Sequence, residues 1–162
     1  MIYIKTQKEI EFIRESCRIV AESLRLVKSN VRVSVTTHEL DRIAEDYIRS
    51  NDAIPAFKGY SQGGLPGFPG SICTSINDAV VHGIPGQTKL EEGDIISLDV
   101  GVLKNNYYGD AALTVAVGNI SDEKKLLLEV TEKSLQLGIE QAKSGNRVHD
   151  ISAAVQDYVE QN

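Results

Sequence analysis

The sequence predicts an α+β fold, in which a unit of two helices and a set of strands is followed by a second pair of helices. Three observations support this prediction. Apolar residues recur at spacings of three and four near both ends of the chain, β-branched runs fill its middle, and the two helix pairs resemble each other in sequence. With 162 residues, of which 41% are hydrophobic and 25% charged, the chain is long enough to bury a core, so we expect one domain or part of one.

The first element is expected to be a long amphipathic helix over residues 6–28. Thr6 followed by Glu9 forms a capping box, which marks a helix start. The apolar face behind this cap consists of Ile10, Ile13, Cys17, Val20, Leu24 and Val27. A second helix is expected from Thr36 or Thr37 to about residue 51. Its inner face consists of Leu40, Ile43, Ala44, Tyr47 and Ile48.

The segment 52–70 is expected to be a loop with at most short strands at its edges. It contains three prolines and five glycines, which favour turns over regular structure. Loops of this kind between regular elements are often binding loops. Residues 71–82, 94–103 and 107–117 are rich in β-branched or aromatic residues and are bounded by Gly, Pro or Asn, so we expect three strands there.

Two further helices and an internal repeat complete the pattern. Ser121 caps a third helix that ends near residue 143, and a fourth is expected over about 149–160. When Thr6 is aligned with Ser121, the two long helices have equal length, and residues 40–51 match residues 151–162 with a shared Asp-Tyr-x-x-x-Asn. We therefore expect an internal duplication of a helix, helix, strands unit, whose second set of strands is missing.

Composition excludes several classes of function. Lys and Arg number 17 against 23 Asp and Glu, and the formal charge of −6 is unlike the basic surface of a nucleic-acid-binding protein. No apolar run approaches the about 20 residues of a membrane span, and the N-terminus has no obvious secretion signal. Cys17 and Cys73 form no CxxC pair, which suits a reducing compartment, so a cytoplasmic location is expected. Walker, GxGxxG, GxSxG and HExxH motifs are absent.

The most informative stretch is a predicted hairpin that carries two aspartates. One apolar face is made by alternate residues of its two strands: Ile96, Leu98, Val100 and Val102, then Tyr107, Ala111, Leu113, Val115 and Val117. Asp99 and Asp110 fall on the opposite face. A turn at Lys104-Asn105 sets them directly across from each other, whereas a turn at Asn105-Asn106 makes them diagonal neighbours. Either register brings the two carboxylates together.

Two like charges at this spacing destabilise a sheet unless something neutralises them. Their neighbours on the same face supply no cation: Ser97, Gly101, Ala112 and Thr114. Two interpretations stay open. Either the pair lies at a wet surface or has one Asp protonated, or it binds a divalent cation, because hard ions prefer carboxylate oxygens. Two carboxylates do not complete a six-coordinate site, so further ligands would have to come from elsewhere.

His82 is the histidine expected nearest to this carboxylate face. It is expected to end an alternating strand, ahead of Gly83 and Pro85, and to stand at the rim of the sheet. A lone histidine is more often a structural or surface residue. Its place between a glycine-rich loop and a carboxylate pair favours a functional role, and both interpretations stay open. The other two histidines, His38 and His149, lie near helix starts.

Three segments stand out by their order and separation: Asn77-Asp-Ala-Val-Val-His-Gly-Ile-Pro, Glu92-Gly-Asp-Ile-Ile-Ser-Leu-Asp-Val-Gly and Tyr108-Gly-Asp-Ala-Ala-Leu-Thr. Together they resemble the type I methionine aminopeptidases, within the wider superfamily of pita-bread metallopeptidases. The resemblance implies the pita-bread (creatinase/aminopeptidase) fold. It also implies that residues 1–162 are the N-terminal part of a single catalytic domain, with the C-terminal part of that domain absent.

Position by position, the resemblance assigns candidate site residues. It implies that Asp99 and Asp110 are ligands of two divalent metal ions (cobalt, manganese, iron or zinc), with Asp110 bridging them. It implies that His82 is the active-site histidine, which hydrogen-bonds the substrate. The pocket for the methionine side chain is implied to include Phe57, Tyr60, Phe68 and Cys73. Asn77 is implied to lie at a site for a monovalent cation.

The activity implied by the resemblance is removal of the initiator methionine from nascent proteins and peptides, by metal-hydroxide attack on the first peptide bond. The partners are then N-termini that begin with methionine, in the vicinity of the ribosome, and the complete protein is expected to be a monomer. In this family one histidine and two glutamate ligands lie beyond the matched region. We therefore expect the 162-residue chain alone to be nearly or wholly inactive and to bind metal weakly.

An incomplete domain also implies a property of the strands. Without the second half, the apolar face and the edges of the strands at 94–117 are expected to be exposed. We therefore expect the chain to aggregate, to dimerise or to pair with a separate C-terminal piece.

Two other functions stay open. The first is a non-catalytic pita-bread protein that binds a nascent chain, the ribosome or a partner protein, although a pure binding protein has no reason to keep two facing aspartates. The second is a related enzyme that cleaves X-Pro bonds or another small amide. Tyr60 and Cys73 together with the segment Val81-His-Gly-Ile-Pro favour methionine, and a panel of dipeptides would decide.

Overall fold

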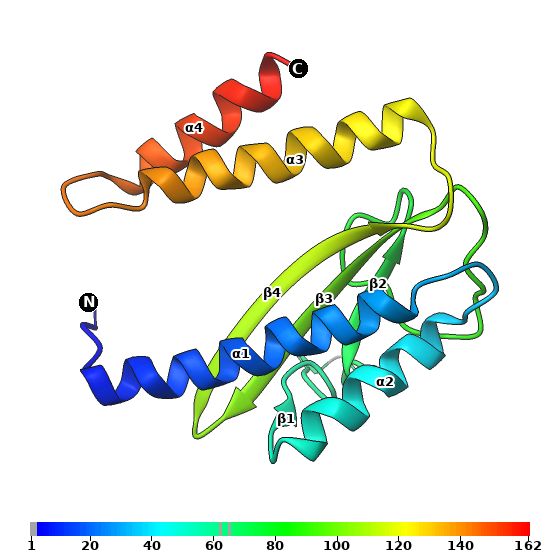
Figure 1. The fold of residues 1–162 in the computed structure, drawn as a ribbon. Helices are drawn as coiled ribbons and strands as arrows, with labels where there is room; N and C mark the ends of the chain where they lie inside the picture. Colours follow the sequence, from blue (N-terminus) through cyan, green and yellow to red (C-terminus); the bar gives the residue numbers. More distant parts are fainter. Residues whose placement is uncertain (1–2, 62, 65) are drawn as a thin grey trace. The chain divides into compact units, whose positions relative to one another are not determined.

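The computed structural model describes residues 3–61, 63–64 and 66–162, and the chain divides into two compact units, Met1–Asn119 and Ile120–Asn162. The first unit contains helices α1 and α2 and the strands β1 to β4, and the second contains helices α3 and α4 (Figure 1). The α+β prediction is confirmed. Within the described parts of the chain, no helix combines the length and the apolar character needed to cross a membrane.

Helices α1 (Gln7–Asn30) and α2 (Thr37–Ser50) begin where the sequence predicts. Each has a complete capping box, in which the hydroxyl of Thr6 or Thr36 accepts a hydrogen bond from the backbone of the third helical residue. The glutamate at that third position accepts a hydrogen bond from the backbone N–H of the threonine in return. Because both partners of each box are satisfied, the two helix starts are fixed at these residues.

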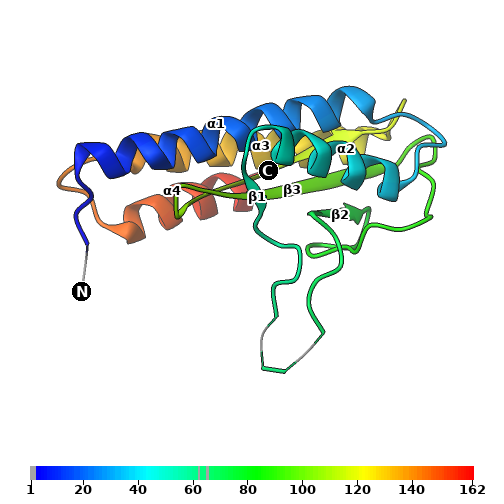
Figure 2. The same ribbon diagram turned by 90° about the horizontal axis from the view of Figure 1, so that it is seen from below.

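A four-stranded antiparallel sheet is built around β3 (Ile95–Lys104). β4 (Tyr107–Ala116) pairs with β3 along its whole length, while β1 (Ile54–Pro55) and β2 (Ile72–Ile76) pair with successive parts of β3. Helices α1 and α2 lie on one face of this sheet, and the segment between β1 and β2 extends on the other side (Figure 2). That segment is the loop with a short strand at its edge that the prolines and glycines predict.

The apolar face of β3 is buried against α1 and α2. Four alternate side chains on this face have no exposed surface: Ile96, Leu98, Val100 and Val102. They form one cluster with apolar residues of the two helices: Val20, Leu24, Val27, Leu40, Ala44 and Ile48. Burial of each such side chain stabilises the fold by about 1.5–3 kcal/mol. The expectation that the apolar face of the strands at 94–117 would be exposed is therefore wrong for β3, because helices of the same unit cover it. On β4, Ala111 is exposed, and Leu113 and Val115 are half-buried.

The hairpin between β3 and β4 turns at Asn105-Asn106, which decides the register that the sequence leaves open. Lys104 pairs with Tyr107, and the two asparagines have left-handed backbone conformations with φ of 52° and 65°. A two-residue type I′ turn requires positive φ at both central residues, and asparagine tolerates this conformation better than most residues. The alternative turn at Lys104-Asn105 is excluded.

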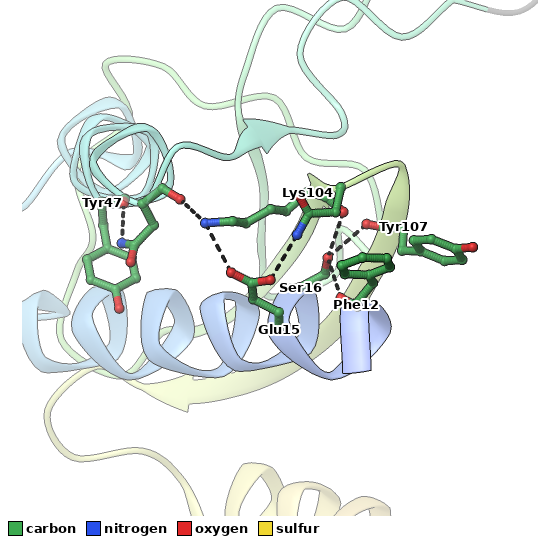
Figure 3. A network of polar contacts seen from close by, with 8 residues as sticks. Phe12, Glu15, Ser16, Tyr47, Lys104 and Tyr107 are labelled. Atoms are coloured by element: carbon green, nitrogen blue, oxygen red, sulfur yellow. Dashed lines mark hydrogen bonds and ion pairs between the residues drawn. The ribbon is translucent and has the colours of Figure 1, made fainter. Parts of the chain in front are cut away.

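A polar network ties the tip of this hairpin to α1 (Figure 3). The buried hydroxyl of Ser16 donates a hydrogen bond to the backbone oxygen of Tyr107 at 2.8 Å. The ammonium group of Lys104 pairs with Glu15 at 3.2 Å and donates to a backbone oxygen just after α2 at 2.6 Å. The ring of Phe12 stacks on that of Tyr107, with centroids 5.7 Å apart. The hairpin is thereby joined to both helices of its unit.

Helix α1 approaches β4 closely at Gly109. A Cβ atom at this position would lie 2.7 Å from the backbone nitrogen of Cys17 and 2.7 Å from the carbonyl carbon of Ser16. Real Cβ atoms do not approach backbone this closely, so only glycine fits here without a shift of the helix.

The strand expected over residues 71–82 is shorter in the structure, because β2 ends at Ile76. Asn77 has a left-handed backbone conformation with φ of 51°, and its side-chain oxygen accepts a hydrogen bond from the backbone N–H of Ile95 at 3.2 Å. The chain turns out of the sheet at this point, although the apolar residues continue. The prediction that this strand extends to His82 is wrong.

The second unit is a pair of packed helices, α3 (Asp122–Gln141) and α4 (Val148–Glu160). The hydroxyl of Ser121 accepts a hydrogen bond from the third residue of α3, which confirms the predicted cap. Helix α3 has 20 residues against 24 in α1, so the expectation of equal length is wrong. The chain leaves the helix at Ala142, and Gly145 in the following turn has φ of 96°, far from helical values. The internal duplication stays a prediction.

Candidate active site

The two predicted metal ligands lie on neighbouring strands of one face of the sheet. Asp99 of β3 is paired with Ala112, and Asp110 of β4 is paired with Gly101. Because the two pairs are separated by two positions, both aspartates point to the same face and are diagonal neighbours. This is the arrangement predicted for a turn at Asn105-Asn106.

The two aspartates repel each other, as the sequence predicts. Burial raises the pKa of Asp99 above its ordinary value, and the negative charge of Asp110 raises it further, while His82 acts in the opposite direction. No Lys or Arg contributes to the shift. A carboxylate pair of which Asp99 is partly desolvated, and which has no Lys or Arg among the groups that act on Asp99, is a fitting donor set for a divalent metal ion, which prefers carboxylate oxygens. Among the described residues, no group of three or more His, Cys, Asp and Glu side chains is placed to hold a metal ion.

His82 lies in a loop beside β2 rather than at the end of a strand. Its backbone is left-handed, with φ of 60°, a conformation that non-glycine residues adopt rarely and that clusters at functional sites. The next residue, Gly83, holds the loop against β2: its oxygen accepts a hydrogen bond from Thr74 N–H at 2.8 Å, and its N–H donates to Ser75 Oγ at 3.0 Å. A Cβ atom at Gly83 would overlap the backbone oxygen of Thr74, so glycine permits this approach.

A cavity of about 800 Å³ brings the candidate residues together. Its lining includes every predicted site residue except Asn77: Phe57, Tyr60, Phe68, Cys73, His82, Asp99 and Asp110. It also includes residues that the sequence analysis does not assign: Ser61, Pro66, Gly67, Pro69 and Ile84. Four of these five belong to the loop between β1 and β2, whose proline and glycine content is the signal that marks it as a binding loop.

Cys73 lies on β2 directly opposite Asp99, where it is 4% exposed. Burial and then the charges of Asp99 and Asp110 raise the pKa of its thiol to about 11. The side chain is therefore a neutral thiol at neutral pH and behaves as a small apolar group. It contributes an apolar surface to the cavity, next to the acidic pair.

Phe57 packs directly on the strand that carries Asp99. A Cβ atom at Gly101 would lie 2.5 Å from Cε1 of the Phe57 ring, so the ring occupies the space that a side chain at this position would need. Gly101 is also the residue paired with Asp110. We call Phe57, Tyr60 and Phe68 the aromatic wall of the cavity. This wall and the carboxylate pair meet at Gly101, a relationship that is not predicted from the sequence.

The loop that forms the aromatic wall is closed at its base by its own backbone. Gly59 N–H donates to the oxygen of Phe68 at 2.8 Å, and Phe68 N–H donates to the oxygen of Tyr60 at 2.9 Å. A Cβ atom at Gly67 would lie 2.8 Å from the oxygen of Gly59, so the two sides of the loop approach closely. Tyr60 and Phe68 are thereby fixed side by side.

Asn77 is not part of the cavity lining. Its side-chain nitrogen donates to Asp94 at 2.7 Å, and its side-chain oxygen accepts the N–H of Ile95. These bonds explain the turn after β2. The monovalent cation expected at this residue stays a prediction.

Residues 11–162 match the sequence pattern of metallopeptidase family M24. The chain therefore belongs to metallopeptidase family M24. It is 51% identical, over 160 residues, to methionine aminopeptidase 1 of Bacillus subtilis (strain 168), a match that covers 99% of this chain and 62% of that protein.

Two solved structures show the extent of the likeness. The crystal structure of methionine aminopeptidase from Rickettsia prowazekii matches with a TM-score of 0.94 and 38% identity, over 99% of this chain and 63% of that one. Prolidase from Pyrococcus furiosus matches with a TM-score of 0.82 and 19% identity, over 98% of this chain and 44% of that one, which is a likeness of fold alone. The predicted pita-bread fold is confirmed over the matched region. The chain spans 62% of the length of the B. subtilis relative.

Proposed function

We propose that the chain belongs to an enzyme that removes N-terminal methionine from peptides and nascent proteins, and that it supplies part of the active site. The observation that carries this proposal is the cavity that brings an aspartate pair, a histidine and an apolar, aromatic wall together. An exopeptidase for methionine needs a metal site, a group that contacts the scissile peptide, and a slot for the first side chain. The chain offers residues for all three.

Asp99 and Asp110 are the proposed ligands of two divalent ions, of which cobalt, manganese, iron and zinc are the candidates. When bound, these ions supply a Lewis acid and a water nucleophile that is active near neutral pH. The two carboxylates hold positive charge at one end of the cavity and thereby orient the substrate. We propose that Asp110, together with Asp99, would hold these ions.

His82 is the proposed contact to the peptide bond. It lines the cavity with the two aspartates, and Gly83 fixes the position of its backbone against β2. An imidazole N–H in this place donates a hydrogen bond to an oxygen of the reacting peptide group and stabilises the negative charge that develops there.

The aromatic residues and Cys73 form the proposed slot for the methionine side chain. Phe57, Tyr60 and Phe68 offer flat apolar surfaces, and the neutral thiol of Cys73 adds a soft, polarisable one. A thioether makes favourable contacts with both kinds of surface. The relative in B. subtilis is 51% identical, whereas the prolidase is 19% identical, so similarity also favours methionine over X-Pro substrates.

The proposed partners follow from this chemistry. They are peptides and nascent proteins whose first residue is methionine, met in the cytoplasm near the ribosome, and the complete enzyme acts as a monomer. A non-catalytic binding protein is the second candidate. It is disfavoured by the like-charged pair at the cavity, which costs stability and has no use in a pure binding site.

The experiment that tests the function is a chimera in which this chain is followed by the part of the B. subtilis relative that lies beyond the matched region. We expect it to release methionine from a Met-Gly peptide in the presence of Mn²⁺, and we expect Asp99→Asn and Asp110→Asn each to abolish that activity. A chimera that melts cooperatively and binds Mn²⁺ but leaves the peptide intact would overturn the proposal. A Leu-Pro peptide in the same assay tests the X-Pro alternative.

A further inference from the structure

Two carboxylates on α2, one helical turn apart, contact the chain near the two ends of the loop that lines the cavity. Asp41 and Glu45 are separated by four residues and therefore share a face of the helix. We use the term cavity loop for the described residues of 57–71, which carry Phe57, Tyr60 and Phe68. Neither carboxylate lines the cavity, and neither has a role in the proposed chemistry.

Asp41 holds the end of the cavity loop. One of its oxygens, Oδ1, accepts hydrogen bonds from the backbone N–H of Ser71 at 2.7 Å and of Ile72 at 3.0 Å. Asp41 is 6% exposed, so these bonds lie in a desolvated place where hydrogen bonds are strong. Ile72 precedes Cys73, so Asp41 acts on the backbone that places Cys73 in the cavity.

Glu45 holds the beginning of the cavity loop. Its Oε2 accepts a hydrogen bond from Lys58 Nζ at 2.5 Å, while Oε1 accepts one from Arg49 at 2.8 Å. Lys58 lies in the short stretch between Phe57 and Tyr60. The side chain of Glu45 is 19% exposed, which screens this ion pair less than most surface pairs.

The backbone of the loop connects these two points. Gly59 and Tyr60 are hydrogen-bonded to Phe68, as described above, so the two sides of the loop move together. A contact that fixes Lys58 and another that fixes Ser71 therefore fix the whole aromatic wall between them. Both contacts come from one rigid helix that packs on β1 and β2.

We propose that Asp41 and Glu45 are positioning residues that determine which N-terminal side chain the cavity accepts. From α2, they hold the two ends of the cavity loop. They thereby set the distance between the aromatic wall and the strand that carries Asp99. This inference rests on the proposed function only for the identity of the selected side chain, methionine. It assigns no contact with substrate or metal to either carboxylate. Loss of either residue is expected to widen the slot and to weaken its discrimination between N-terminal side chains.

The direct test is amide hydrogen exchange of the 162-residue chain, which needs neither metal nor activity. Asp41→Ala removes the acceptor of two backbone N–H groups. We expect exchange at Ser71 and Ile72 to accelerate about tenfold or more, and exchange at Gly59 and Phe68 to accelerate with them. Asp41→Asn removes the charge but keeps an oxygen in the same place, so we expect it to restore most of the protection.

The matched control is Asp46→Ala, which removes an exposed carboxylate of the same helix and is expected to leave exchange in the loop unchanged. If Asp41→Ala leaves exchange at Gly59 and Phe68 unchanged while Ser71 and Ile72 accelerate, the two ends of the loop are not coupled and the inference is overturned. Exchange that accelerates equally in every strand would mean that the variant has lost global stability. In that case, hydrogen exchange in the Glu45 variants decides whether the inference holds.

Glu45 is tested by exchanging the charges. Glu45→Lys is expected to accelerate exchange at Gly59 severalfold. The double variant Glu45→Lys with Lys58→Glu is expected to reverse part of this acceleration, because it restores an ion pair between the same positions while it leaves a like charge beside Arg49. Failure of the double variant to restore protection, in a chain whose α1 and β3 amides remain protected, would overturn the role of the pair.

Kinetics in the active chimera separate this inference from the proposed function. Asp41→Ala is expected to raise KM for a Met-Gly peptide about tenfold with little change in kcat, and to narrow the ratio of kcat/KM between Met-Gly and Leu-Gly peptides. An equal fall in kcat and kcat/KM would argue against positioning. If no methionine is released but the exchange results hold, the function fails and the loop contacts stand.

Discussion

The ring of Phe57 lies against the backbone of Gly101, at the residue of β3 that pairs with Asp110. An aromatic residue from the loop and a glycine from the strand therefore define the border between the apolar wall of the cavity and its acidic end. Because a Cβ atom at Gly101 would come within 2.5 Å of the ring, this border has no room for a larger residue.

The first prediction concerns this border. Gly101→Ala is expected to displace the Phe57 ring and to lower the free energy of unfolding by about 1–3 kcal/mol, as overpacked cores do. Urea denaturation of the chain measures this. Gly86→Ala is the matched control, because a Cβ atom at Gly86 would meet nothing within 4 Å. Equal stability of the two variants would show that the ring yields without cost.

The second prediction concerns the aspartate pair. In the absence of metal, Asp110→Asn is expected to stabilise the chain by about 0.2–1 kcal/mol, because it removes a like charge diagonal to Asp99. Addition of millimolar Mn²⁺ is expected to raise the melting temperature of the unmodified chain and not that of the variant. Asp46→Asn, on the exposed surface of α2, should behave as the unmodified chain does. An equal Mn²⁺ effect on both would place the ion elsewhere.

The third prediction concerns pH. The hydrogen bond from Lys58, followed by that from Arg49, lowers the pKa of Glu45 from 4.5 to about 2, against an opposing effect of burial. A carboxyl group whose pKa is lower in the folded state stabilises the fold above the unfolded value, and this stabilisation is lost as the pH falls from 4.5 towards 2.

Because Lys58 and Arg49 are 41% and 53% exposed, solvent screening reduces the effect to about 1 kcal/mol. Urea midpoints measured between pH 7 and pH 3 are expected to fall more steeply for the unmodified chain than for Glu45→Gln. Parallel curves for the two proteins would contradict the pKa assignment.

The fourth prediction concerns Ser16, whose buried hydroxyl donates to the backbone oxygen of Tyr107. Ser16→Ala leaves that oxygen without this donor and is expected to cost about 1–2 kcal/mol of unfolding free energy. Ser29→Ala removes an exposed hydroxyl that bonds only within α1, and it serves as the control. Equal unfolding free energies for Ser16→Ala and Ser29→Ala would mean that the hairpin tip finds another donor.

Features that depend on neighbours in sequence are predicted well. The capping box of α1 joins Thr6 to a residue three positions on and predicts the helix start. The turn stays open between Lys104-Asn105 and Asn105-Asn106 in the sequence, but both turns place the two aspartates on one face. The placement of Asp99 beside Asp110 follows from alternation and turn geometry. Each of these rests on a local rule that needs no knowledge of the rest of the fold.

Features that depend on contacts between distant segments are not predicted by pattern. The apolar run before His82 reads as a strand, yet side-chain bonds of Asn77 to the chain near Ile95 end it six residues earlier. The hydrogen bond that Ser71 N–H donates to Asp41 spans 30 residues of sequence, and no periodic pattern predicts it. The role of a buried carboxylate such as Asp41 can be recognised only when the structure shows the backbone groups that it binds.

Gly109 has a consequence for the alignment of the two strands. A slip of the hairpin by two residues would keep the faces of β4 but would bring Tyr107 or Ala111 to the point where the strand touches the backbone of α1. Neither side chain fits there. Close packing of α1 against Gly109 therefore allows only the observed alignment of β4 with β3. Because this alignment places Asp110 relative to Asp99, the absence of a Cβ atom at Gly109 also fixes the spacing between the two carboxylates.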